Sequence, residues 1–130
     1  MVMAEPLLKF SEVRSGYGEA VVLDGVSFEL PERGALALLG RNGVGKTTLL
    51  LTAMGFVNLA RGSVHLAGED ISKLPAHKRA LAGLGWVPQE RDIFPSLSVE
   101  ENLTVVARPG RWDLASIYAL FPRLKERSGN

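Results

Sequence analysis

Apolar and polar residues follow one another along this chain in patterns that suit strands first and helices later. Residues 7–14 mix apolar and polar positions as a half-buried strand does, and residues 26–30 alternate strictly. Residues 35–39 are five consecutive apolar residues, which predicts a strand covered on both faces. Residues 62–70 predict a strand and a turn, and residues 84–87 predict another core strand that stops at a proline. Strands therefore dominate the first part of the pattern.

Helices are predicted by apolar spacing together with residues that favour helix ends. Glycine and proline mark some of these ends, and a serine or aspartate that can accept a backbone hydrogen bond marks others. The signals are Gly55 after residues 46–54, the pair Pro75 and Gly83, the capping box Ser98-Val99-Glu100-Glu101, and Asp113 before the apolar series Leu114, Ile117, Tyr118 and Phe121. Residues 15–18 predict a turn. The order predicts an α/β fold with antiparallel sheet at its front.

Composition narrows the class of protein. The chain has 130 residues, of which 46% are hydrophobic, so it can form one domain with a true core. It has no cysteine, which excludes a disulfide scaffold and a thiolate metal site. The net charge is +1 without a long basic run, so we expect no nucleic acid as the main ligand. His65 and His77 are assigned to surface or packing roles.

The candidate chemistry lies in one glycine-rich loop. Residues 40–47 read Gly-Arg-Asn-Gly-Val-Gly-Lys-Thr and match the pattern G-x-x-x-x-G-K-[ST] without a gap. Glycines allow a tight turn whose N–H groups surround phosphate oxygens, and the following helix directs its positive end at the same anion. The predicted nucleotide-binding residues here are Gly40, Arg41, Asn42, Gly43, Val44, Gly45, Lys46, Thr47 and Thr48. Lys46 reaches the β- and γ-phosphates, Thr47 coordinates Mg²⁺, and Thr48 adds a phosphate hydrogen bond.

Segments around the loop resemble the ATP-binding subunits of ATP-binding-cassette (ABC) transporters. Gly16-Tyr17-Gly18 and Val22-Leu23-Asp24-Gly25-Val26-Ser27-Phe28 are similar to the opening of these subunits. The resemblance implies that Tyr17 stacks on adenine, for which an aromatic face is suited, and that Val22 packs near the base or sugar. Trp86-Val87-Pro88-Gln89 resembles the family's glutamine loop, which implies that Gln89 binds Mg²⁺ and the attacking water. Lys46 and Gln89 are thus the candidate catalytic residues.

A further segment suggests the type of transporter. Residues 94–103 (Phe-Pro-Ser-Leu-Ser-Val-Glu-Glu-Asn-Leu), the loop at residues 40–48 and the tail at residues 120–127 most resemble subunits that drive uptake of branched-chain amino acids, or of urea and amides. The resemblance runs from Leu7 to Asn130. It implies permease subunits, a second ABC ATPase subunit and, indirectly, a solute-binding protein as partners, and a location on the cytoplasmic face of the cell membrane.

The resemblance also implies how the chain is organised. We expect a P-loop NTPase core with an antiparallel β subdomain in front and the beginning of a helical subdomain, as an incomplete domain. The core spans about residues 1–89 and the helical part about residues 90–130. ATP and Mg²⁺ are the expected ligands, and ATP hydrolysis coupled to uptake of a small polar solute is the expected function of the complete subunit.

Three motifs of the family are not found in the sequence. These are the serine-glycine signature, the apolar run ending in Asp-Glu, and a late switch histidine. Residues 21–24 end in Asp but precede the loop and match the family's opening better. Because hydrolysis needs a water-orienting carboxylate beyond the P-loop, we expect weak or no turnover from this chain alone. A truncated nucleotide-binding module without catalysis remains the alternative, and a soluble cassette ATPase of DNA repair or translation is a third hypothesis.

Overall fold

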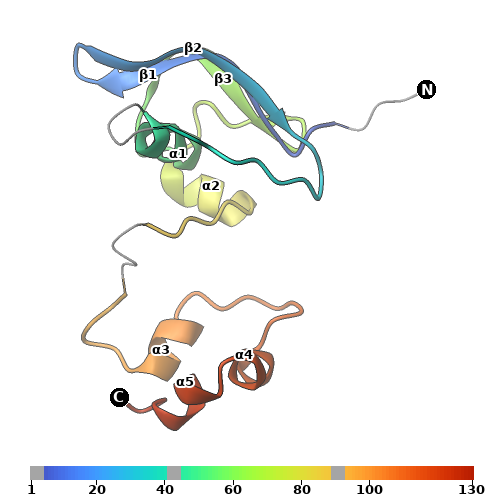
Figure 1. Cartoon of the computed structure of the whole chain (residues 1–130), viewed down its shortest axis with the longest axis vertical. Coiled ribbons are helices and arrows are strands. Elements are labelled where there is room, and N and C mark those ends of the chain that lie inside the picture. The colour runs from blue at the N-terminus through green and yellow to red at the C-terminus, as the bar shows by residue number, and fades with distance from the viewer. Residues whose placement is uncertain (1–4, 41–44, 89–92) are drawn as a thin grey trace. The chain divides into compact units, whose positions relative to one another are not determined.

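A computed structural model describes residues 5–40, 45–88 and 93–130 of the chain (Figure 1). The chain divides into two compact units, residues 1–86 and 87–130, and each unit is described by itself. Among the described residues, no helix has both the length and the apolar character needed to cross a bilayer.

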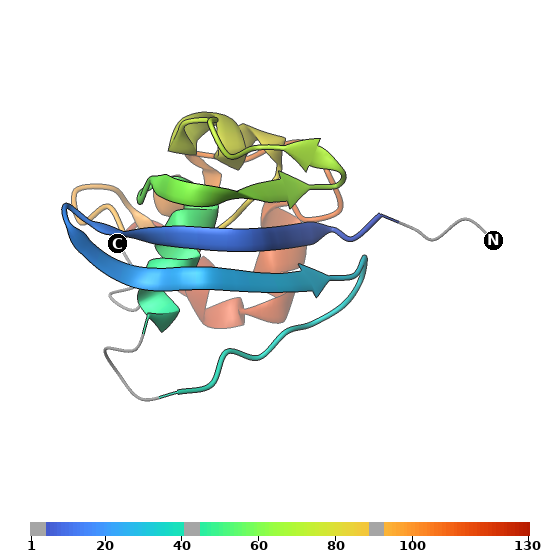
Figure 2. The same cartoon turned by 90° about the horizontal axis from the view of Figure 1, so that it is seen from above.

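The first unit is built on an antiparallel sheet. Its strands are β1 (Leu8–Tyr17), β2 (Ala20–Leu30), β3 (Leu59–Leu66) and β4 (Glu69–Asp70), in the order β2-β1-β3-β4. Figure 2 shows β2, β1 and β3 side by side, with α1 across one face. The expected antiparallel sheet at the front is confirmed. The turn expected at residues 15–18 is wrong in part, because β1 continues to Tyr17 and pairs it with Ala20.

A bulge interrupts β1 at Glu12. The register of β1 against β2 shifts between Phe10 and Val13, and Glu12 has a φ of 47°. The Ser27 hydroxyl holds this conformation, accepting the Glu12 N–H at 2.8 Å and donating to the Glu12 carboxylate at 3.0 Å. On β3, Gly62 has no side chain where a Cβ would collide with the Glu12 carbonyl. Both neighbouring strands therefore accommodate the extra residue.

The bulge changes which side chains of β1 face the core. Before it the even position Phe10 is buried, and after it the odd positions Val13 and Ser15 are buried. One inserted residue reverses the alternation of a strand, since side chains point to opposite faces in turn. The buried apolar core consists of Phe10, Val13, Leu23, Ala53, Val64 and Ile71.

Two helices complete the first unit. Helix α1 (Lys46–Met54) ends at Gly55 and α2 (Ala76–Ala82) ends at Gly83, as the sequence predicts. The Gly55 φ of 89° is a left-handed conformation that glycine adopts without steric cost.

The two predicted core strands are wrong for the described structure. Residues 35–39 and 84–87 form no strand, and Leu39 is 90% exposed and Val87 83% exposed. A strand needs a neighbour to satisfy its backbone groups, and the described sheet pairs only β1 to β4 with one another. The apolar runs are real but only partly covered: Leu84 packs against the core and the Trp86 ring lies 5.6 Å from that of Phe56, whereas Leu39 and Val87 are exposed.

The second unit contains three short helices, α3 (Val99–Thr104), α4 (Leu114–Leu120) and α5 (Pro122–Glu126). Both predicted caps are confirmed: Ser98 and Asp113 each accept the N–H three residues on, and each forms a capping box. The Asn102 side chain binds the backbone of Phe94 through both its oxygen and its nitrogen, at 2.8 and 3.1 Å. These contacts fold residues 94–102 into a turn that leads into α3.

Candidate functional site

The described part of the glycine-rich loop consists of its two ends. Gly40 closes the first end, and Gly45 precedes the first turn of α1, which contains Lys46, Thr47 and Thr48. Arg41, Asn42, Gly43 and Val44 lie outside the described residues, and so does Gln89. The loop thus leads directly into a helix N-terminus, where unpaired N–H groups and the helix dipole favour an anion.

Lys46 links the two ends of the loop. Its ammonium group donates to the carbonyl oxygen of Gly40, six residues earlier. The first turn of α1 contains no acidic residue, so no carboxylate there competes for the ammonium group or for the helix N-terminus. Thr47 is exposed and Thr48 is buried. The two adjacent threonines therefore have different surroundings, solvent for Thr47 and protein for Thr48.

Val22 lies against the loop. A Cβ at Gly45 would lie 3.4 Å from the Cγ1 of Val22 and 3.0 Å from the Cδ2 of Leu23. Gly45 also has a φ of 99°, so both its conformation and its close packing require glycine. The second strand of the sheet thus supports the start of α1.

Tyr17 is brought to the same helix turn. Its hydroxyl lies 3.3 Å from the Thr48 Oγ1, although the tyrosine side chain is 52% exposed. Beside it is a cavity of about 500 Å³, whose lining includes Arg14, Tyr17, Phe56 and Asn58. That volume is in the range of small-ligand sites. Tyr17 therefore offers an exposed ring next to a cavity and holds a contact to the phosphate-loop helix.

Three buried polar residues behind the site were missed by the sequence reasoning. Ser15 and Thr52 are 1% and 0% exposed, and their hydroxyl oxygens lie 2.9 Å apart. Arg79 is 3% exposed and donates to the carbonyls of Thr52 and Ala53, both at 2.9 Å. Burial lowers the pKa of Arg79, and the charge of Asp70 opposes that shift. Of these three residues, only Thr52 is marked in the sequence, as a polar residue within an apolar helix pattern.

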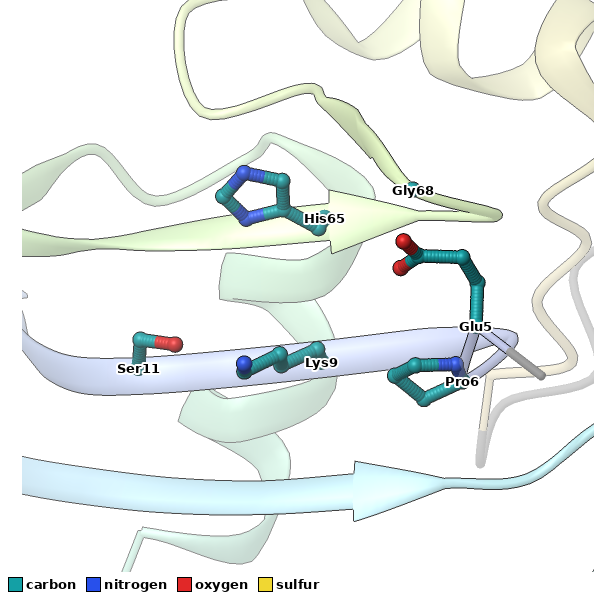
Figure 3. Close-up of a pocket in the computed structure, with 6 residues that line it drawn as sticks. All are labelled: Glu5, Pro6, Lys9, Ser11, His65 and Gly68. Carbon is teal, nitrogen blue, oxygen red and sulfur yellow. The ribbon is translucent and has the colours of Figure 1, made fainter. Parts of the chain in front are cut away.

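A second cavity lies over β1 and β3, where Lys9, Ser11 and His65 are part of its lining (Figure 3). It measures about 290 Å³ and is lined by Glu5, Pro6, Lys9, Ser11, His65 and Gly68. Lys9, which the loop chemistry does not involve, forms an ion pair with Glu29 at 3.6 Å. None of the residues that line this cavity belongs to the glycine-rich loop or to α1, so we assign it no role in nucleotide binding.

The residues at the start of α1 fit a magnesium ion held together with a phosphate. Mg²⁺ in nucleotide sites is bound through one or two protein oxygens and substrate phosphates rather than by an all-protein cage. The exposed Thr47 hydroxyl is such an oxygen. The described residues hold no group of three or more His, Asp or Glu side chains that could bind a metal without phosphate.

Comparisons with known proteins agree with this geometry. A family model described as ABC transporter matches residues 23–128. The chain is 36% identical over 126 residues to the high-affinity branched-chain amino acid transport ATP-binding protein BraG of Pseudomonas aeruginosa, covering 93% of this chain and 54% of that protein. It is 40% identical over 100 residues to the lipopolysaccharide export system ATP-binding protein LptB of Haemophilus influenzae, covering 77% and 42%.

A solved structure shows the same fold. A bacterial Atm1-family ABC exporter with ATP bound matches the whole chain with a TM-score of 0.73 and 25% identity, over 24% of its own length. A probable ABC transporter ATP-binding protein of Azorhizobium caulinodans is 39% identical over 103 residues, covering 79% of this chain and 37% of that protein. The chain thus spans about half or less of the length of these relatives.

Proposed function

The chain belongs to the ABC transporter family, and from that membership we propose that it is the N-terminal portion of an ATP-binding subunit. It binds Mg-ATP, and the complete subunit couples ATP hydrolysis to the transport of a small polar solute. One observation carries the binding proposal: Tyr17 contacts Thr48 in the first turn of the helix that follows the glycine-rich loop. This contact places an aromatic ring that can hold a base beside the N-terminal turn of α1, which can hold phosphates.

Each site residue has a proposed part in holding the nucleotide. Residues 40–45 surround the phosphate oxygens with backbone N–H groups, and α1 directs its positive end at them. Lys46 leaves the Gly40 carbonyl and pairs with the β- and γ-phosphates. Thr48, whose hydroxyl contacts Tyr17, adds a hydrogen bond to phosphate.

The base and the metal are held on either side of these phosphates. Tyr17 stacks on adenine, and Val22 packs beside the base or sugar from its place against Gly45. Thr47 and Gln89 hold Mg²⁺, which neutralises charge that develops on the phosphates during transfer. Gln89 also orients the attacking water.

The transported solute is proposed from the relatives. Branched-chain amino acids are our first candidate, since BraG matches over 93% of this chain. LptB, named for lipopolysaccharide export, is 40% identical, so export of a lipid-linked molecule is the second candidate. Either function requires permease subunits and a second ATPase subunit at the cytoplasmic face of the membrane.

We expect this chain to bind Mg-ATP but to hydrolyse it poorly. The residues here hold phosphates, but the sequence contains no apolar run ending in Asp-Glu that would orient water. We propose that the chain by itself binds Mg-ATP with little turnover. Phosphate release at the rate of a complete subunit would contradict this.

The test of binding is isothermal titration calorimetry with Mg-ATP on the chain and on Lys46→Ala. Loss of the main phosphate cation is expected to weaken affinity by at least roughly tenfold, because a hydrogen bond to a charged group contributes about 1.5–3 kcal/mol. Lys78→Ala removes an exposed lysine of α2 and is the matched control. Equal affinity of Lys46→Ala and the unmodified chain would overturn the site.

A further inference from the structure

Two pairs of hydroxyls join β1 to α1. Ser15 faces Thr52 at 2.9 Å, and Tyr17 faces Thr48 at 3.3 Å. On the strand the two residues are two apart, which separates them by about 6.7 Å. On the helix their partners are four apart, which separates them by about 6 Å along the axis. The spacings match, so strand and helix are held in one register by two contacts of the same kind.

The direction of the inner hydrogen bond follows from counting protons. The Thr52 hydroxyl donates its single proton to the Thr48 carbonyl at 2.7 Å. It therefore accepts at its oxygen, and Ser15 is the donor in the contact between them. Thr52 thus ties Ser15 of the strand to Thr48, the residue that Tyr17 also contacts.

The bulge at Glu12 makes this arrangement possible. If β1 ran through Glu12 as a regular strand without a bulge, the even positions of β1 would continue to face α1, and Ser15 and Tyr17 would point away from it. Burial also favours the contact between these two hydroxyls, because a hydroxyl buried without a partner is costly and Ser15 and Thr52 satisfy each other. The two residues are therefore placed by the backbone, and their hydroxyls satisfy each other inside the core.

We propose that Ser15 and Thr52 are positioning residues that set the distance between the Tyr17 ring and the first turn of α1. The inference rests on the proposed function, in which that ring holds the base and that turn holds the phosphates. Moving β1 relative to α1 changes the distance between base and phosphates that the site accepts. Ligands that contain both parts are then affected, whereas a ligand that contains only the phosphates is not.

The experiment compares Mg-ATP with Mg-tripolyphosphate by calorimetry, and its readout is the ratio of the two dissociation constants. Thr52→Val keeps the side-chain shape and removes the hydroxyl. The preference for ATP over tripolyphosphate is expected to fall by about two- to tenfold, the range for loss of the one hydrogen bond that joins Ser15 of β1 to Thr52 of α1, while tripolyphosphate binding stays within about twofold. Thr52→Ser restores the hydroxyl and is expected to restore the preference.

Two further variants keep the test decisive. Thr104→Val removes the hydroxyl of an exposed threonine, which donates to the carbonyl four residues earlier at 2.9 Å in α3, and should leave the preference unchanged. If Thr52→Val does not fold, Ser15→Ala combined with Thr52→Val removes both hydroxyls and leaves no buried donor unpaired. An unchanged preference in a folded variant overturns the inference. The proposed function fails separately, if Lys46→Ala binds both ligands as the unmodified chain does.

Discussion

The Arg79 guanidinium donates to the carbonyl oxygen of Thr52 at 2.9 Å, which joins α2 to the last turn of α1. The same side chain donates to the carbonyls of Ala53, Leu74 and Ser72 at 2.9, 2.9 and 3.0 Å. All four acceptors are backbone oxygens. Arg79 therefore supplies donors to the carbonyls of Thr52 and Ala53 in the last turn of α1, and a cation at this end of α1 also suits the helix dipole.

Arg79→Met is expected to lower the free energy of unfolding by roughly 2–4 kcal/mol, because several buried carbonyls lose their donor together. Arg79→Lys is expected to lose less, since a lysine supplies donors from one point only. Urea unfolding followed by circular dichroism measures the change. Lys78→Met alters the exposed neighbour and should stay within about 0.5 kcal/mol. A similar, small loss in both methionine variants would contradict the role of Arg79.

The sequence predicted elements whose signals are local. Gly55, Gly83, Ser98 and Asp113 end or begin helices as expected, because each satisfies backbone groups of its own helix. The runs at residues 35–39 and 84–87 were predicted as strands and are not. A run of consecutive apolar residues predicts that both faces of the segment are buried. It does not show which segment covers them, and that depends on partners elsewhere.

For the candidate site, the sequence predicts the residue types but not the contacts that hold these residues in place. The motif at residues 40–48 predicts a phosphate-binding loop from its own spacing, and the structure adds the Lys46 contact to Gly40 and the Tyr17 contact to Thr48. The bulge at Glu12 depends on Ser27 and Gly62, which are 15 and 50 residues away. No local pattern could show that it turns Ser15 towards Thr52.

Asp70 is expected to make the first unit sensitive to acid. Its carboxylate accepts the Ser72 N–H at 2.8 Å and the Ser72 hydroxyl, and these hydrogen bonds lower its pKa below the ordinary 3.8. Ser72 in turn accepts the N–H of the buried Val64 at 2.8 Å. Because the folded pKa is lower than the unfolded one, the stabilisation is present above pH 3.8 and is lost as pH falls through the folded pKa.

The measurement is the urea midpoint of the chain and of Asp70→Asn between about pH 6 and about pH 3. The unmodified chain should lose more stability on acidification than Asp70→Asn, since the amide does not titrate. Asp24→Asn is a suitable control, because the Asp24 carboxylate forms a long ion pair with Arg14, at 4.0 Å. Parallel curves for the chain and Asp70→Asn would show that the Ser72 contacts do not contribute.

Ser98→Ala is expected to loosen the start of α3. The serine hydroxyl accepts the Glu101 N–H at 3.1 Å and the Glu101 carboxylate accepts the Ser98 N–H at 3.1 Å. Loss of such a cap costs about 1 kcal/mol of helix stability. Hydrogen exchange by NMR should show a faster Glu101 amide, with little change after Ser96→Ala at an exposed position. An unchanged Glu101 rate would mean that the cap is dispensable.

Tyr17 combines two functions that two substitutions can separate. Its exposed ring is proposed to stack on adenine, and its hydroxyl contacts Thr48. Tyr17→Ala removes both, whereas Tyr17→Phe keeps the ring and removes only the hydroxyl. Loss of one stacking aromatic costs about 1–3 kcal/mol, so Tyr17→Ala is expected to weaken Mg-ATP binding by roughly 5- to 150-fold. Mg-tripolyphosphate has no base and should lose no more affinity in Tyr17→Ala than it loses in Tyr17→Phe.

Tyr17→Phe is expected to weaken Mg-ATP binding by no more than about tenfold, because one neutral hydrogen bond contributes about 0.5–1.5 kcal/mol. If that loss comes from Thr48, then Tyr17→Phe should have no further effect in a Thr48→Val background, which a double-mutant cycle measures. Tyr118→Phe removes a tyrosine hydroxyl from α4 and serves as the control. Equal losses of ATP and tripolyphosphate affinity in Tyr17→Ala would refute stacking, because a base platform cannot affect a ligand without a base.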